Sequence, residues 1–270
     1  MKSRIAFLLV CVTLAIPAYC ATNTFTVTGN VAIVDDGYNG TTFSMASLPL
    51  MIPASGMGVV RRVAVRVAIA HTWIGDLVIK VQSPAGTLVT LMSMPGVVES
   101  SDNGTSITGD SSNLSTSFPI QFEDGGPKSA ENMGNTILNA QNVCEHDLAC
   151  TYDPNNGAAP SGKLAALIGQ NMLGTWRLYV GDAAVGDLGT LNEFTLIIVT
   201  DDSPQMRIAR TNNVVAIAWP TNAIGFTLES NQTLRTNGWA VVNGSPVISG
   251  TNYLVNVPTT NVTSFFRLRK

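Results

Sequence analysis

Charged side chains are scarce in this sequence of 270 residues: only 12% are Asp, Glu, Lys or Arg, and the formal net charge is −3. The Lys and Arg residues are scattered along the chain and form no basic run. Nucleic acids and anionic membrane surfaces are recognised by concentrated positive charge. We therefore expect no nucleic-acid partner. Because 45% of the residues are hydrophobic, the chain still has enough apolar material for a packed core.

Long apolar runs are absent after the N-terminal segment. There, Lys2 and Arg4 precede an apolar run over residues 5–17, followed by small residues at the usual cleavage positions. This pattern is typical of a secretory signal peptide, and we place its cleavage after Cys20. Lipidation of Cys20 is an alternative that the bulky Tyr19 disfavours. An uncleaved anchor is disfavoured because spanning a membrane takes roughly 20 apolar residues. We expect a secreted protein, extracellular or at the cell surface, without a membrane span after cleavage.

Cysteine is rare, and only two cysteines lie beyond the predicted signal peptide, residues 1–20. These are Cys144 and Cys150, six positions apart in the segment CEHDLAC. In an exported protein such a pair most simply forms a disulfide that closes a small loop. The alternative is a metal site that adds His146 and Asp147, but this spacing is unusual for zinc ligands. The sequence therefore favours a Cys144–Cys150 disulfide.

Histidine is rarer still, with only His71 and His146. Serine and cysteine hydrolases need a base beside the nucleophile and a third group that orients the base. We expect His71 to end a strand and to hydrogen-bond the backbone of the following turn or Asp76. His146 lies inside the cysteine loop. No catalytic triad is indicated, so we expect no catalytic residues.

The strongest positive signal is the alternation of β-branched residues. Residues 60–69, VRRVAVRVAI, place their apolar side chains on one face, as in a half-buried strand. Residues 77–81 repeat the alternation after a Gly-Asp turn. Within residues 21–34, Gly29 and Asn30 predict a turn between a first pair of strands. Abundant Asn, Ser, Thr and Gly favour short strands and polar turns, so we predict an all-β fold.

Two long motifs dominate the first 200 residues. Residues 71–87 read HTWIGDLVIKVQSPAGT, and residues 174–199 read GTWRLYVGDAAVGDLGTLNEFTLIIV. Together with the FED at 122–124, they resemble the P domain, or P/Homo B domain, of kexin- and furin-type proprotein convertases. That domain follows a subtilisin-like catalytic domain and also occurs in secreted bacterial proteins. The resemblance covers about residues 24–200.

The resemblance implies a jelly-roll β-sandwich that stabilises or accompanies a protease and has no chemistry of its own. We thus predict a secreted, non-catalytic stabilising or binding module, associated with extracellular proteolysis or the cell surface. Its partner would be a secreted protease, a surface protein or a glycan. A proprotein-convertase-like serine endopeptidase is the alternative by family association. A carbohydrate-binding module is a further alternative, in which exposed tryptophans would stack on sugars. The four candidates are Trp73, Trp176, Trp219 and Trp239.

A polar break at residues 201–204, DDSP, separates the two parts of the chain. We place the P domain at residues 21–202 and a smaller β unit at residues 205–270. The second part alternates apolar and polar residues, with hairpin-type Asn-Gly turns at 237–238 and 243–244. It resembles a small fibronectin-III-like or immunoglobulin-like β-sandwich.

Four aspartates beside glycines or at strand ends are candidate Ca²⁺ ligands: Asp76, Asp124, Asp182 and Asp187. Calcium prefers several oxygen ligands, which loop carboxylates and backbone carbonyls supply. The alternative is that aspartate next to glycine simply suits tight turns, and no EF-hand spacing occurs. Calcium is the only cofactor that we predict.

Overall fold

The computed structural model describes residues 20–53, 58–105, 109–201, 204–211, 213–221, 223–258 and 263–270. The predicted signal peptide, apart from Cys20, lies outside the described residues. None of the helices in the described part of the chain combines the length and apolarity needed to cross a membrane. Regular structure in these residues consists of β-strands and short 3-10 turns, as the sequence predicts.

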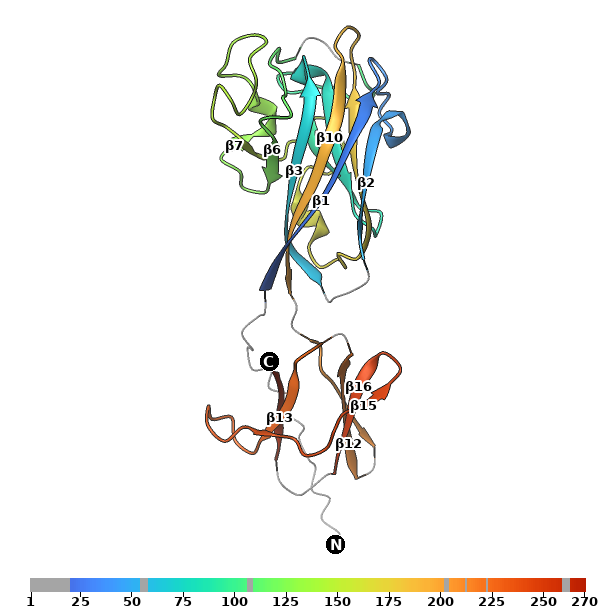
Figure 1. The fold of residues 1–270 in the computed structure, drawn as a ribbon, viewed down its shortest axis with the longest axis vertical. Helices are drawn as coiled ribbons and strands as arrows, with labels where there is room; N and C mark the ends of the chain where they lie inside the picture. Colours follow the sequence, from blue (N-terminus) through green and yellow to red (C-terminus); the bar gives the residue numbers. More distant parts are fainter. Residues whose placement is uncertain are drawn as a thin grey trace.

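Two sheets that pack face to face form the first part of the chain (Figure 1). The larger sheet has six strands in the order β1 (Cys20–Ile33), β10 (Gly189–Asp201), β3 (Val59–His71), β6 (Ile120–Glu123), β8 (Thr151–Asp153) and β7 (Lys128–Ser129). The smaller sheet has four strands in the order β2 (Ala46–Ile52), β9 (Gly174–Asp182), β4 (Leu77–Gln82) and β5 (Leu88–Ser93). All these pairs are antiparallel except β6–β8 and β7–β8.

The core of this sandwich is built from the alternation seen in the sequence. On β3, Val63, Val65 and Val67 are buried, and the residues paired with the latter two on β10 are Leu196 and Phe194. Since strand side chains alternate between faces, one apolar face of each sheet meets the other in the core.

The first strand differs from the sequence-based prediction. Residues 21–34 do not form a pair of strands turned at Gly29 and Asn30. They form one long strand, β1, which pairs with β10 and shifts register between Thr28 and Val31. An extra residue in one strand is accommodated as a β-bulge, and glycine suits bulges as well as turns. The predicted turn is therefore a bulge.

The second part of the chain forms two further antiparallel sheets. One has the order β11 (Arg207–Thr211), β12 (Val214–Pro220), β16 (Asn252–Pro258) and β15 (Val247–Ser249), and the other β14 (Ala240–Val241), β13 (Thr227–Asn231) and β17 (Phe265–Arg269). Trp219 is buried in their small core. Within the described residues no strand pairs across from this part to the first. The exact domain limits stay a prediction.

Candidate functional site

The two sequence motifs meet at one end of the sandwich. Strand pairing sets His71 of β3 opposite Gly189 of β10, and Leu77 of β4 opposite Asp182 of β9. The loop after β3, with the 3-10 turn η2 (Ile74–Asp76), therefore lies beside the loop that joins β9 to β10. Residues a hundred positions apart in the sequence form one loop cluster.

His71 is buried within this cluster. Its Nε2 lies 3.1 Å from Asp182 Oδ2 and donates to that carboxylate, while Nδ1 lies 2.9 Å from the carbonyl oxygen of Trp73. A side chain at position 189 would overlap the imidazole ring, so the glycine there is a packing requirement. The contact with the turn backbone agrees with the sequence-based expectation. The carboxylate that the structure sets beside the ring is Asp182, from the distant motif.

Asp182 connects three segments of the chain. Besides His71, its carboxylate accepts a hydrogen bond from the Ala184 N–H at 3.0 Å. Its backbone carbonyl accepts from the Tyr38 N–H at 2.8 Å. A buried carboxylate is stable when its oxygens are hydrogen-bonded in this way. These hydrogen bonds of Asp182 hold the segments of the loop cluster together.

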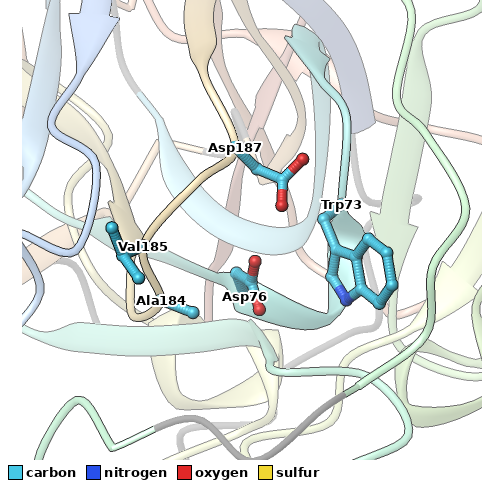
Figure 2. Close-up of a pocket in the computed structure, with 5 residues that line it drawn as sticks. All are labelled: Trp73, Asp76, Ala184, Val185 and Asp187. Atoms are coloured by element: carbon cyan, nitrogen blue, oxygen red, sulfur yellow. The ribbon is translucent and has the colours of Figure 1, made fainter.

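A shallow depression of about 220 Å³ opens next to the His71–Asp182 pair. It is lined by Trp73, Asp76, Ala184, Val185 and Asp187. Figure 2 shows the indole ring of Trp73 on one side and the carboxylates of Asp76 and Asp187 beside it. Asp187 Oδ1 accepts a hydrogen bond of 2.6 Å from a threonine hydroxyl of the loop after β3. An aromatic ring and two carboxylates therefore share one surface.

The structure separates the four predicted calcium ligands. Asp76, Asp182 and Asp187 lie in the loop cluster, whereas Asp124 lies elsewhere and caps the 3-10 turn η4 (Leu164–Leu167). The Asp124 carboxylate accepts from the backbone N–H groups of the first two residues of η4, at 2.9 and 2.7 Å. Among the described residues, no group of three or more His, Cys, Asp or Glu side chains is arranged to hold a metal ion. Calcium binding stays a prediction.

The two cysteines beyond the predicted signal peptide form a disulfide, Cys144–Cys150, with Cα atoms 4.6 Å apart. This bond uses both thiolates that the alternative metal site would need. Asp147, the other proposed ligand, accepts from the backbone N–H groups of Cys144 and Ala149 at 2.9 and 3.1 Å. The cysteine loop is thus closed by a covalent bond and an internal carboxylate.

The four tryptophans fall into two classes. Trp176 and Trp219 are buried in the cores of the two parts of the chain and offer no surface. Trp73 lines the depression, and Trp239 lies under the guanidinium group of Arg267, which is 4.3 Å from its ring centroid. Of these four tryptophans, only Trp73 and Trp239 remain candidates for a sugar platform.

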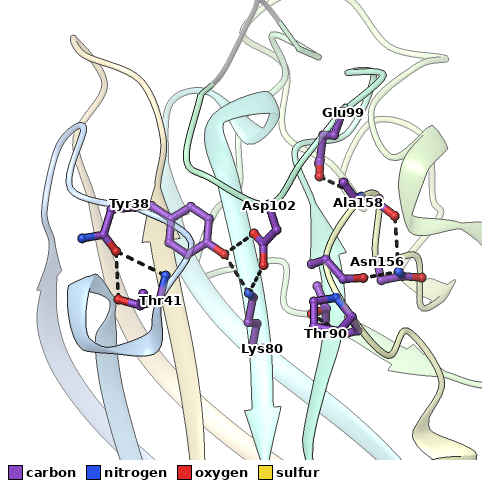
Figure 3. A network of polar contacts seen from close by, with 12 residues as sticks. Tyr38, Thr41, Lys80, Thr90, Glu99, Asp102, Asn156 and Ala158 are labelled. Carbon is purple, nitrogen blue, oxygen red and sulfur yellow. Dashed lines mark hydrogen bonds and ion pairs between the residues drawn. The ribbon is translucent and has the colours of Figure 1, made fainter.

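A second polar cluster was not foreseen from the sequence. Lys80 of β4 is buried and donates to the hydroxyl of Tyr38 at 2.7 Å and to Asp102 Oδ2 at 2.8 Å (Figure 3). Burial, followed by the hydrogen bond to Asp102, raises the pKa of Tyr38 above its ordinary value, so the phenol stays protonated. The available signal was a lysine inside the otherwise apolar strand LVIKV.

Comparison with protein-family models finds a match to the proprotein convertase P-domain over residues 60–116. A search of curated proteins found no match. Two solved structures are similar: the serine protease of Aeromonas sobria in complex with its chaperone, with 20% identity and a TM-score of 0.37, and the same protease alone, with 18% and 0.36. The alignments cover 69% and 68% of this chain. They cover only 28% and 27% of those chains.

The matched segment runs along β3, through the loop cluster and η2, and on past β5. It contains the first of the two motifs and the Trp73 and Asp76 side chains of the depression. The resemblance drawn from these residues is therefore confirmed: residues 60–116 of this chain match the proprotein convertase P-domain family.

Proposed function

We propose that this chain is a secreted, non-catalytic P-domain protein that stabilises or positions a serine protease outside the cytoplasm. The observation that carries the proposal is the family match over residues 60–116, whose motif forms the centre of the loop cluster. The alignments span less than a third of either Aeromonas sobria protease. The proposal concerns this module, and the serine protease that it would serve is its proposed partner.

The geometry of the histidines supports a non-catalytic role. The side chain of His71 is fully buried, and its ring contacts Asp182 and the Trp73 carbonyl. His146 contacts the Asn142 carbonyl at 3.2 Å and Glu145 at 3.7 Å. A general base must come within hydrogen-bond reach of the proton that it removes from a nucleophile or substrate. Because the imidazole of His71 is inaccessible to solvent, it cannot reach a substrate. We therefore assign His71 a structural role.

A direct test treats the purified full chain with a serine-directed fluorophosphonate probe and assays casein hydrolysis. We expect neither labelling nor hydrolysis, and labelling of any serine would contradict the proposal. A second assay measures the thermal half-life of each serine protease exported by the same host, with and without this chain. Prolonged activity of one protease is the expected result. If none is affected, the protease-associated role is wrong.

Glycan binding is the second candidate, and one observation favours it. Trp73 lies beside Asp76 and Asp187, and an aromatic ring with neighbouring hydrogen-bond acceptors is the combination that holds a sugar ring. A glycan array with the wild-type chain tests this role. Trp73→Ala should abolish any binding while the matched change Trp239→Ala retains it. Equal loss of glycan binding in both variants would show that the depression is not the binding site.

A further inference from the structure

Lys80 lies in a small apolar cluster on the outer side of the four-stranded sheet. The side chain starts from β4, and only 2% of it is exposed. The cluster is separate from the main core and consists of Tyr38, Met45, Val78, Met94, Val97 and Ala183, with Tyr179 packed against it. An ammonium group in such surroundings is costly unless it is paired. Asp102, with 12% of its side chain exposed, supplies the paired carboxylate.

The loop that carries Asp102 is held against the segment that carries Tyr38. A side chain at Gly40 would overlap the backbone of Asp102, and one at Gly104 would overlap the Tyr38 carbonyl. Gly104 also has a φ of +78°, which glycine adopts without strain. Close backbone packing on both sides therefore fixes the carboxylate over Lys80.

Three polar groups converge in this cluster (Figure 3). Lys80 Nζ lies 2.8 Å from Asp102 Oδ2, and the Tyr38 hydroxyl donates to Asp102 Oδ1. Lys80 Nζ also lies 2.7 Å from the Tyr38 oxygen. One carboxylate oxygen thus faces the amine, and the other faces a hydrogen-bond donor. This is the arrangement of an amine nucleophile, a leaving oxygen and a donor for the developing oxyanion.

We propose that Lys80 and Asp102 condense to an intramolecular isopeptide bond. A proton passes from the ammonium group to the carboxylate, and Nζ attacks Cγ of Asp102. The Nζ–Cγ bond forms and the Cγ–Oδ2 bond breaks. Oδ2 leaves as water with two of the three ammonium hydrogens, and the amide nitrogen keeps the third. Both charges vanish, and no oxidant, reductant or cofactor takes part.

The surroundings favour each part of this reaction. The reactive forms are the neutral amine and the protonated acid, and direct contact between the two groups lets a proton pass from one to the other. Fixed neighbours in the right geometry gain an effective concentration of roughly 10⁵–10⁸ M over free reactants. The Tyr38 hydroxyl, which stays protonated, stabilises the charge that develops on Oδ1. Exclusion of water also protects the product from hydrolysis.

The chain contains a matched control for this chemistry. Lys163 Nζ lies 2.7 Å from Asp153 Oδ2, so the same two groups meet at nearly the same distance. Their side chains are 55% and 31% exposed. If contact alone were sufficient, both pairs would condense. The proposal requires burial, so only Lys80 and Asp102 should be linked.

The experiment is a tryptic map of the folded, purified full chain after denaturation. Trypsin cleaves after free lysine but not after an acylated one, and residues 67–128 contain no internal Lys or Arg besides Lys80. We expect one peptide, residues 67–128, lighter than its sequence mass by one water, and normal cleavage after Lys163. Separate, unmodified peptides 67–80 and 81–128 would overturn the proposal.

Three variants sharpen the result. Asp102→Asn should still be linked, with loss of ammonia, and give the wild-type peptide mass. Lys80→Arg keeps the positive charge but should be cleaved after position 80 and carry no link. Tyr38→Phe keeps the ring and should slow linkage about 100-fold. A linked Lys80→Arg peptide would overturn the assignment, and an unchanged rate in Tyr38→Phe would overturn the role of the hydroxyl. Circular dichroism identifies any variant that fails to fold, and the wild-type map decides the proposal independently.

Discussion

The two parts of the chain are stabilised in different ways. The sandwich of residues 20–201 has a large continuous core and adds a buried His71–Asp182 pair, a buried Lys80–Asp102 pair and a disulfide. The part formed by residues 207–269 has a small core around Trp219, and its ion pairs are partly exposed. Small folds bury a smaller fraction of their surface and are correspondingly marginal. The sandwich thus accommodates polar groups in its interior, whereas the smaller part relies on a small apolar core in which Trp219 is the largest fully buried side chain.

The largest expected effect comes from removing the anchor of each part. Trp176→Ala and Trp219→Ala should each lower the free energy of unfolding of their own part by about 3–5 kcal/mol. Both side chains are essentially fully buried. Urea titration followed by circular dichroism, with limited proteolysis to locate the unfolded part, measures the two transitions. If either substitution shifts both transitions equally, the two parts unfold as one unit and the comparison fails.

The second-largest effect is expected from removing the buried histidine. His71→Ala leaves the Asp182 carboxylate buried without its ring partner, and such a loss costs about 3 kcal/mol. Urea titration should show this effect on the sandwich transition alone. Thr72→Ala is the matched control, because it removes only the exposed hydrogen bond to Asp187 and should cost a few tenths of a kcal/mol. Equal effects of the two changes would mean that the buried pair contributes nothing special.

The disulfide should stabilise the sandwich by a smaller amount. Replacing both Cys144 and Cys150 with alanine should cost about 2 kcal/mol, since the closed loop is short. Reduction of the wild-type chain with dithiothreitol should give the same shift in the melting temperature. Any movement of the transition that belongs to residues 207–269 would contradict this expectation.

Calcium, if it binds the loop cluster, should raise only the sandwich transition. At a concentration a hundred times the dissociation constant, a ligand adds about 2.7 kcal/mol, and at ten times about half of that. We expect Ca²⁺ to raise the melting temperature, EDTA to lower it, and Asp76→Asn with Asp187→Asn to abolish the response. Asp124→Asn is the control, because this residue lies outside the cluster. A midpoint that neither Ca²⁺ nor EDTA moves would reject the calcium site.

The smallest effect concerns the partly exposed pair Asp153–Lys163. Burial tends to raise the pKa of Asp153, but hydrogen bonds from Lys163 and the Gly125 N–H outweigh it, and the net pKa is lowered. The stabilisation is therefore present above the ordinary aspartate pKa and is lost as the pH falls through the depressed value. Lys163→Met should cost about 0.5 kcal/mol at pH 7, and this cost should shrink as the pH falls through the depressed pKa of Asp153. A larger loss of stability at low pH than at pH 7 would contradict this expectation.

The sequence predicted the β-structure where a strand has one buried face. The alternation over residues 60–69 becomes β3, and the FED at 122–124 overlaps the end of β6. The sequence-based prediction was wrong at Gly29 and Asn30, because glycine fits a turn and a bulge equally well. The pairing of β1 with a strand more than 150 residues later decides between them. Strands β11 and β15 were not predicted, since exposed edge strands lack a buried face and hence a clear alternation.

For the site, the sequence identified the two motifs but not their contacts. His71 and Asp182 were both singled out, yet their partnership depends on strand register, which local patterns do not encode. Asp124 looked like the other aspartates because it also neighbours a glycine, but its carboxylate caps η4. Lys80 and Asp102 come from segments whose neighbourhood only the folded chain creates.

The pairing of β1 with β10 also determines when the sandwich can close. Cys20 lies opposite Asp201, so the first strand has to wait for the last one before its hydrogen bonds form. Contacts that bridge so many residues slow the search for the native state. During synthesis, the unpaired Thr-rich strand is an open template for foreign strands until residue 201 becomes available. Because of this delayed closure, the hydrogen-bonding edge of the first strand stays exposed until the whole first sandwich has been synthesised.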